Sequence, residues 1–284
     1  MAIFTNQATL SYNGRVVNSN ITTGQIATAL SGAKTALIDQ YAPDGTLTYV
    51  ISLTNSSNAD LTDLTVTDNL GAYTFGQTLL YPLSYVEGSL KYYVNGVLQS
   101  EPDTTAGPPL AVSGISVPAN GNAIIVYQSN VTEFAPLGEN GTITNVATVS
   151  GESLSAPLTL SETVGSINDS LLSITKSLEP LVVEENGELT YTFVIENSGN
   201  ISVDALANAV ITDIFNPVLR DITVRFNGEV WNEPENYTYN EATGAFATVP
   251  GQITVPGATF VQNPVTGVYT SEPGTAVLTV SGRI

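Results

Sequence analysis

The stretch Leu47-Thr-Tyr-Val-Ile-Ser-Leu-Thr-Asn-Ser56 decides the fold of this chain. Polar and apolar residues alternate in it and β-branched or aromatic side chains are frequent, which predicts a strand with one buried face. The pattern returns as Leu189-Thr-Tyr-Thr-Phe-Val-Ile-Glu-Asn-Ser198, and Lys34 has a counterpart in Lys176 at the same offset of 142 residues. Similar runs, separated by Gly, Pro and Asn turns, recur without any helical period. The sequence therefore predicts an all-β protein with two tandem immunoglobulin-like β-sandwich domains.

Further matches between the two halves place the domains. Val66-Thr-Asp68 corresponds to Ile211-Thr-Asp213, and Gly121-Asn-Ala-Ile-Ile125 resembles Gly274-Thr-Ala-Val-Leu278. The first half continues beyond its last match into two more strands, whereas the second half stops at Ile284. We therefore expect three parts: an N-terminal donor hairpin over 1–30, a first sandwich over 31–167 with its own closing hairpin at 143–164, and a second sandwich over 168–284 without one.

The N-terminal segment resembles the piece that the second sandwich lacks. Phe4-Thr-Asn-Gln-Ala-Thr-Leu-Ser11 matches Ile143-Thr-Asn-Val-Ala-Thr-Val-Ser150 at its Thr, Asn, Ala, Thr and Ser positions. The first 30 residues thus look like the closing hairpin of a domain to which they cannot belong by their place in the sequence, because a closing hairpin follows its domain. In a simpler alternative, this hairpin is an extra layer on the first domain and the second domain is stable without it.

A sandwich without its last strands exposes backbone donors and acceptors, which form a template for an incoming strand. Two such domains in line span on the order of 80 Å. Thirty extended residues reach at most about 100 Å, and a hairpin uses half of that length. Unless the two domains fold back on one another, the hairpin is therefore expected to insert into another copy, and this head-to-tail contact propagates into a fibre. The expected donor residues are Phe4, Thr5, Asn6, Ala8 and Leu10.

Composition excludes several classes of function. The 284 residues include no Cys and no His, which removes thiolate or imidazole metal sites and imidazole acid–base catalysis. Seven Lys plus Arg against 26 Asp plus Glu give a net charge of −19, which disfavours nucleic acid and membrane partners. No carboxylate pair stands out for glycosidase chemistry and no calcium-loop motif occurs. We expect no enzyme activity, no cofactor and no metal.

Several of these motifs resemble a known family. Lys34-Thr, Gly45-x-Leu-Thr-Tyr49, Thr54-Asn-Ser, Val66-Thr-Asp68 and Ile143-Thr-Asn-x-Ala-Thr148 resemble the bacterial conserved repeat domain catalogued as domain of unknown function eleven, and a second copy spans Thr175 to Asp213. This domain occurs in surface and adhesin-like proteins. Two copies without a recognisable secretory signal also resemble the major structural proteins of clostridial spore appendages. The resemblance implies an extracellular location on a spore or cell surface, reached without a signal peptide.

The three lysines of the chain suggest a covalent link. Lys34 and Lys176 occupy equivalent strands, Asp68 and Asp213 lie on equivalent later strands, and Asn145 and Asn6 belong to the two hairpins. A buried amine, a carboxamide and a carboxyl group can form an isopeptide bond, an arrangement that related Gram-positive surface sandwiches use. Lys34 would join Asn145 internally, with Asp68 assisting. Lys176 would join Asn6 of the next subunit, with Asp213 assisting. Alternatively, both lysines are solvated strand-end residues.

Two functions follow from these expectations. The first is a structural subunit of a filament or spore appendage whose partner is another copy of itself, with an unknown anchor or tip protein. The second is a monomeric surface adhesin or binding module whose loops contact a ligand. The N-terminal hairpin favours the first.

Overall fold

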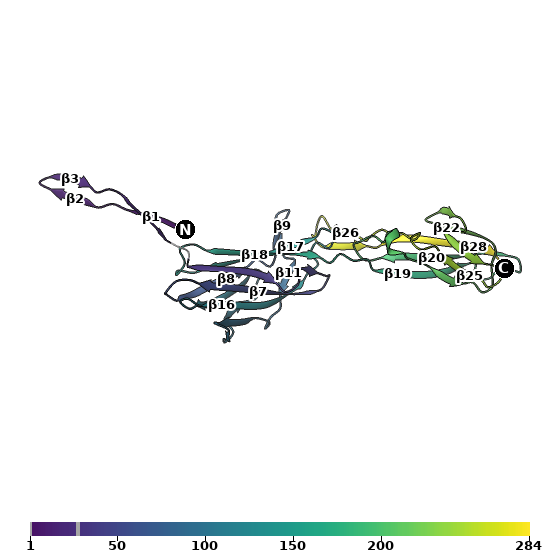
Figure 1. Cartoon of the computed structure of the whole chain (residues 1–284), viewed down its shortest axis with the longest axis horizontal. Helices are drawn as coiled ribbons and strands as arrows, with labels where there is room; N and C mark the ends of the chain where they lie inside the picture. The colour runs from purple at the N-terminus through teal and green to yellow at the C-terminus, as the bar shows by residue number, and fades with distance from the viewer. Residues whose placement is uncertain (1, 27–28) are drawn as a thin grey trace. The chain divides into compact units, whose positions relative to one another are not determined.

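The structure, a computed structural model, describes residues 2–26 and 29–284. Contacts divide the chain into two units. The first runs to Pro136 and includes Gly141–Gly165, and the second comprises Leu137–Asn140 and Ser166–Ile284. The only helical element of the described residues is a short 3-10 turn, η1 (Ala205–Ala207), so the expected all-β class is confirmed (Figure 1). Within the described residues, no helix is long and apolar enough to cross a membrane.

The first domain consists of two sheets. One has the order β13 (Val97–Leu98), β12 (Lys91–Val94), β16 (Asn122–Val131), β7 (Thr46–Asn55) and β5 (Leu30–Ala36), with β11 (Leu83–Tyr85) also paired to β16. The other has the order β14 (Asp103–Thr105), β15 (Leu110–Val117), β8 (Leu61–Asp68), β17 (Thr142–Ser150), β18 (Leu158–Ser166) and β6 (Gln40–Tyr41). A separate ribbon pairs β9 (Tyr73–Phe75) with β10 (Thr78–Leu80). The expected closing hairpin is β17 and β18.

The second domain has one sheet of similar extent and one much smaller sheet. The larger has the order β19 (Leu172–Glu179), β20 (Glu188–Asn197), β28 (Gly274–Arg283), β22 (Arg220–Phe226) and β23 (Glu229–Trp231). The smaller has only β21 (Thr212–Ile214), β25 (Ala245–Thr248) and β24 (Tyr237–Asn240), and a ribbon pairs β26 (Thr259–Gln262) with β27 (Tyr269–Glu272). The smaller sheet thus contains no counterpart of the closing hairpin among the described residues.

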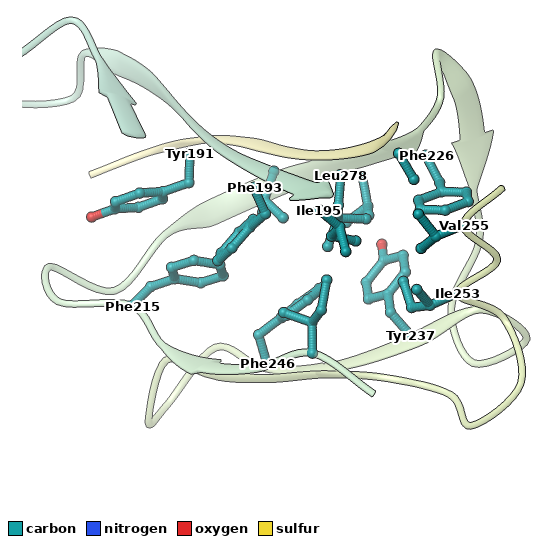
Figure 2. Close-up of a cluster of buried hydrophobic side chains, with 14 of the residues drawn as sticks. Tyr191, Phe193, Ile195, Phe215, Phe226, Tyr237, Phe246, Ile253, Val255 and Leu278 are labelled. Atoms are coloured by element: carbon teal, nitrogen blue, oxygen red, sulfur yellow. The ribbon is translucent and has the colours of Figure 1, made fainter. Parts of the chain in front are cut away.

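The repeated strand pattern explains how each domain builds its core. In β7 and β20 every second residue is buried, because successive side chains of a strand point to opposite faces. The buried residues are Leu47, Tyr49, Ile51 and Leu53 in β7, and Leu189, Tyr191, Phe193 and Ile195 in β20. Figure 2 shows the second core, where Phe215 lies beside Tyr191 with ring centroids 4.9 Å apart.

The N-terminal segment forms the hairpin that its sequence predicts. β1 (Ala2–Asn6) pairs with β4 (Thr22–Ile26), and β2 (Thr9–Tyr12) pairs with β3 (Arg15–Asn18). The turn at Asn13 and Gly14 has φ of 46° and 71°, as a two-residue hairpin turn requires. Every side chain from residue 3 to residue 23 is exposed. The exposed side chains include the apolar Phe4, Leu10 and Val16. Because an isolated two-stranded hairpin is at best marginally stable in water, we expect another surface to cover them.

Candidate functional site

The first candidate site lies inside the first sandwich. Lys34 projects inward from β5, Asp68 ends β8, and Asn145 lies on β17. Their exposed fractions are 3%, 1% and 0%, and Lys34 and Asp68 form an ion pair. The structure therefore brings together the three residues expected from sequence, and it contradicts the alternative of a solvated Lys34.

Hydrogen bonds connect these three residues through a tyrosine. Tyr127 OH donates to the Asp68 carboxylate, and Nδ2 of Asn145 donates to Tyr127 OH at 3.3 Å. The backbone N–H of Leu70 donates to the other Asp68 oxygen at 2.9 Å. Oδ1 of Asn145 is buried without a hydrogen-bond partner in the described part of the chain. A buried carbonyl of this kind is costly, and it marks Asn145 as a group held for more than packing.

Burial also prepares Lys34 as a nucleophile. Loss of solvent lowers the pKa of Lys34 from 10.5 to about 8, although the nearby charges of Asp68 and Glu162 oppose this change. The ammonium lies 4.9 Å from the ring centroid of Tyr49 and 5.9 Å from that of Tyr127. Moving one proton from Lys34 to Asp68 gives a neutral amine and a neutral acid, the pair that amide exchange requires.

The second domain repeats half of this site. Lys176 on β19 and Asp213 on β21 form an ion pair, and Lys176 lies 4.3 Å from the ring centroid of Tyr191. These two side chains are 39% and 19% exposed, whereas those of Lys34 and Asp68 are 0% and 1% exposed. In the first domain Tyr127 stands opposite Tyr49 on the neighbouring strand, and in the second domain Val280 takes this place opposite Tyr191. No carboxamide of the described residues is hydrogen-bonded to this second pair.

The open side of the second pair is the place where the first domain has its hairpin. In the first domain β17 pairs with β8, opposite Asp68. In the second domain β21 pairs only with β25 among the described strands, so its other edge is free. Beside that edge lies a groove of about 170 Å³, lined by Leu172, Ser173, Ile174, Ile195, Ala209, Val210, Ile211 and Ile253. We call the free edge of β21 together with this groove the acceptor groove.

The N-terminal hairpin carries a carboxamide at the position that matches Asn145. Asn6 ends β1 opposite Thr22, as Asn145 stands opposite Glu162 in the closing hairpin. The other expected donor residues are exposed as well: Phe4 and Thr5 lie on β1, Ala8 lies between β1 and β2, and Leu10 lies on β2. A Cβ built on Gly24 would lie 2.3 Å from the Phe4 ring, so that ring lies directly over Gly24. Arg15 is the only charged side chain among residues 1–30, which contrasts with the acidic remainder of the chain.

Sequence reasoning missed two parts of these sites. Tyr127 connects Asp68 to Asn145, but the repeat has Val280 at its position, so repeat matching gave no signal for it. It also left the Asn13–Gly14 turn unnoticed, although the Asn-Gly pair is a strong hairpin signal. No group of His, Cys, Asp or Glu side chains in the described chain is arranged to hold a metal ion.

Comparisons with known proteins return structures only. No family model matches the chain, and no curated protein matches it. The major pilin subunit of Bacillus cereus is 10% identical over 98% of this chain and 74% of its own, with a TM-score of 0.36. The pilus backbone protein of Streptococcus pneumoniae is 12% identical over 86% of this chain, with a TM-score of 0.33, and the match spans 55% of its length. A collagen-binding domain from a Staphylococcus aureus adhesin matches 50% of this chain at 12% identity and a TM-score of 0.30. No function is carried over from matches this distant.

Proposed function

We propose that this chain is the structural subunit of an extracellular filament or spore appendage that grows head to tail. One observation carries the proposal: the second domain has the lysine and the aspartate of the first site but lacks the hairpin with the asparagine, and an exposed hairpin with an asparagine at the matching position stands at the other end of the chain. Insertion of that hairpin into the acceptor groove of another copy gives the second domain its closing strands and buries the exposed side chains of the hairpin.

The internal repeat provides the register of insertion. In the first domain Ala147 stands opposite Asp68, and Val149 stands opposite Val66. By the same pairing Ala8 stands opposite Asp213 and Leu10 opposite Ile211, so Leu10 enters the groove. Phe4, Asn6, Ala8 and Leu10 then face inward as Ile143, Asn145, Ala147 and Val149 do. Burying one Leu or Phe side chain stabilises the complex by about 1.5–3 kcal/mol.

The same arrangement supports covalent sealing. The lysine Nζ attacks Cγ of the asparagine, a C–N bond to lysine forms, the bond to Nδ2 breaks, and ammonia leaves with a proton relayed by the aspartate. Lys34 and Asn145 react in this way within one chain. Lys176 and Asn6 react between neighbours once the hairpin is inserted. Electron microscopy of the purified chain tests the assembly itself, because a monomeric adhesin forms discrete particles and a filament subunit forms fibres.

The internal bond predicts a definite mass. A chain without residues 1–28 cannot donate a hairpin, so its intact mass reports Lys34–Asn145 alone. We expect the sequence mass less one ammonia, and the full sequence mass for the same chain with Asp68→Ala. The bond closes the loop from 34 to 145, which stabilises the fold by about 4–5 kcal/mol by analogy with a disulfide of that span. The full sequence mass for the truncated chain with Lys34, Asp68 and Asn145 intact would contradict the bond. Lys91→Arg is the control, and it should still show the loss of one ammonia.

The pH dependence of this reaction follows from the shared proton. The ion pair of the Lys34 ammonium and the Asp68 carboxylate contains the same number of protons as the reactive pair of neutral amine and neutral acid. The reaction rate therefore does not require Lys34 to release its proton to solvent. Above about pH 8 Lys34 loses its proton, so the pair no longer holds the proton that the reaction relays. We expect the rate of ammonia loss to fall about tenfold per unit above that pH. It is measured by mass after chain that has never folded, collected in denaturant from insoluble aggregates at its full sequence mass, is diluted into buffers of set pH. A rate that rises through pH 8 would show that Asp68 relays no proton.

A further inference from the structure

We infer that the segment 181–183 of the second domain is a second docking edge, and that it pairs with the returning strand, β4, of the hairpin of a second copy. The inference rests on the proposed head-to-tail function and deepens it. The hairpin would then be held along both of its strands, between β21 on one side and 181–183 on the other.

The first domain shows the pairing that this edge lacks. There β6 lies beside β18 in the sheet, and the N–H of Gly165 donates to the carbonyl of Asp39 at 2.9 Å. Tyr41 is 2% exposed and anchors the segment in the core. This segment is the continuation of β5, and it returns to the body through the turn closed by Gly45.

The second domain has the same segment without its partner strand. Gly187 closes an equivalent turn, and the two domains have the same number of residues from Lys34 and Lys176 to that turn. Val183, the counterpart of Tyr41, packs against the core. Leu181 and Val182 are 82% and 87% exposed, although both are large and apolar. Their counterparts Asp39 and Gln40 are exposed as well, so the pairing in the first domain covers the backbone of the segment rather than these side chains. In the second domain no strand of the described residues is paired with 181–183, and this unpaired backbone is a template for an incoming strand.

Side-chain sizes show that the hairpin fits the second domain. In the first domain Leu160 stands opposite Ala147 and reaches towards Gly32, where a Cβ would lie 3.4 Å from its Cδ1. The position of Gly32 in the second domain is Ile174, which is 53% exposed. In the hairpin the residue bonded to Ala8 is the small Ser19, whose N–H donates to the Ala8 carbonyl at 2.8 Å. The first domain thus combines a large hairpin residue, Leu160, with Gly32. The N-terminal hairpin and the second domain combine the small Ser19 with the large Ile174.

Insertion along both edges also explains how the second site is closed. Glu162 of β18 stands opposite Asn145 and acts on Lys34 by its charge. Thr22 of β4 stands opposite Asn6 and would occupy the corresponding place beside Lys176. The strand that pairs with 181–183 therefore forms the outer wall of the second site, and Lys176 leaves solvent only when that strand is docked.

A cysteine pair tests this register, because the native chain has no Cys. Gln25 aligns with Gly165 and Leu181 aligns with Asp39, so Gln25→Cys and Leu181→Cys place two thiols on neighbouring strands of different copies. Asn6→Ala is added to the chain so that no isopeptide ladder hides the result. We expect mild oxidation of the assembled protein to give a ladder on a denaturing gel that a reductant collapses. The control pairs Gln25→Cys with Val265→Cys, because Val265 is 86% exposed and belongs to a different segment, the turn between β26 and β27.

Hydrogen exchange of unsubstituted fibres gives a second measurement that needs no variant. The amides of 181–183 should become protected on assembly, with exchange slowed at least about a hundredfold by pairing. Fibres without the ladder and with fast exchange at 181–183 would overturn the second edge and leave head-to-tail assembly standing. If the unsubstituted chain forms no fibres, the proposed function itself fails.

Discussion

A chain that lacks residues 1–28 should remain monomeric under conditions in which the full chain forms fibres. The truncation removes the whole donor hairpin and leaves both sandwiches, and the acceptor groove then has no strand to receive. Negative-stain electron microscopy and light scattering distinguish the two states directly. We expect fibres from the full chain and discrete particles from the truncated one.

Two neighbouring residues provide a matched control for that result. Leu10 should enter the groove beside Ile211, whereas Thr9 should face outward on the same strand. Leu10→Asn removes a buried side chain and should weaken each contact by about 2–3 kcal/mol, which is roughly a 30- to 150-fold loss in affinity. Thr9→Asn should assemble normally. Fibres from the truncated chain, or equal assembly by both variants, would mean that the second sandwich needs no donated strand.

Fibres of the full chain should resist boiling in detergent, and they should lose this resistance when either partner of the intermolecular bond is changed. Lys176→Arg replaces the attacking amine by a guanidinium that stays charged at all accessible pH values. Asn6→Ala removes the carbonyl that is attacked. Both variants should still form fibres, because the apolar contacts remain, but denaturing gels should show monomers in place of a ladder.

Lys91 is the control for this experiment. It is the third lysine of the chain, lies on β12, and points its Nζ towards the carbonyls of Gly88 and Leu90. Lys91→Arg should therefore keep the boiling-resistant ladder. A ladder that survives Lys176→Arg, or that disappears with Lys91→Arg, would place the covalent link elsewhere. Unsubstituted fibres that boil to a single monomer band would rule out the intermolecular bond.

Much of this architecture is visible in the sequence because the two domains are repeats. The alternation in Leu47–Ser56 and Leu189–Ser198 identifies the central strands, and it is strong because each has one face in a core. The match of Phe4–Ser11 with Ile143–Ser150 identifies the N-terminal hairpin, because Phe4, Asn6, Ala8 and Leu10 keep the polarity of the residues that the closing strand β17 buries. Repeat matching also selects Lys34, Asp68 and Asn145, and the structure places all three in one buried hydrogen-bonded network through Tyr127.

Other parts of the site carry no such pattern. Tyr127 belongs to the first site alone, and only the three-dimensional pairing of β16 with β7 shows that it faces Asp68. The 181–183 edge is too short to show periodicity, and its meaning depends on the pairing of β6 with β18. The different exposures of the two lysines cannot be deduced from sequence either, since both lie at the same position of the same strand pattern.

The truncated chain also provides the most direct test of hairpin donation. It retains the acceptor groove but has no hairpin, so it should accept the free hairpin of a growing fibre and end growth there. Mixing it with full-length chain before assembly should shorten the fibres in proportion to its share, as measured by electron microscopy. The account predicts that equal amounts yield mostly short oligomers, each with one truncated copy. Fibre lengths that do not change with added truncated chain would contradict insertion of the hairpin into the second domain of a neighbour.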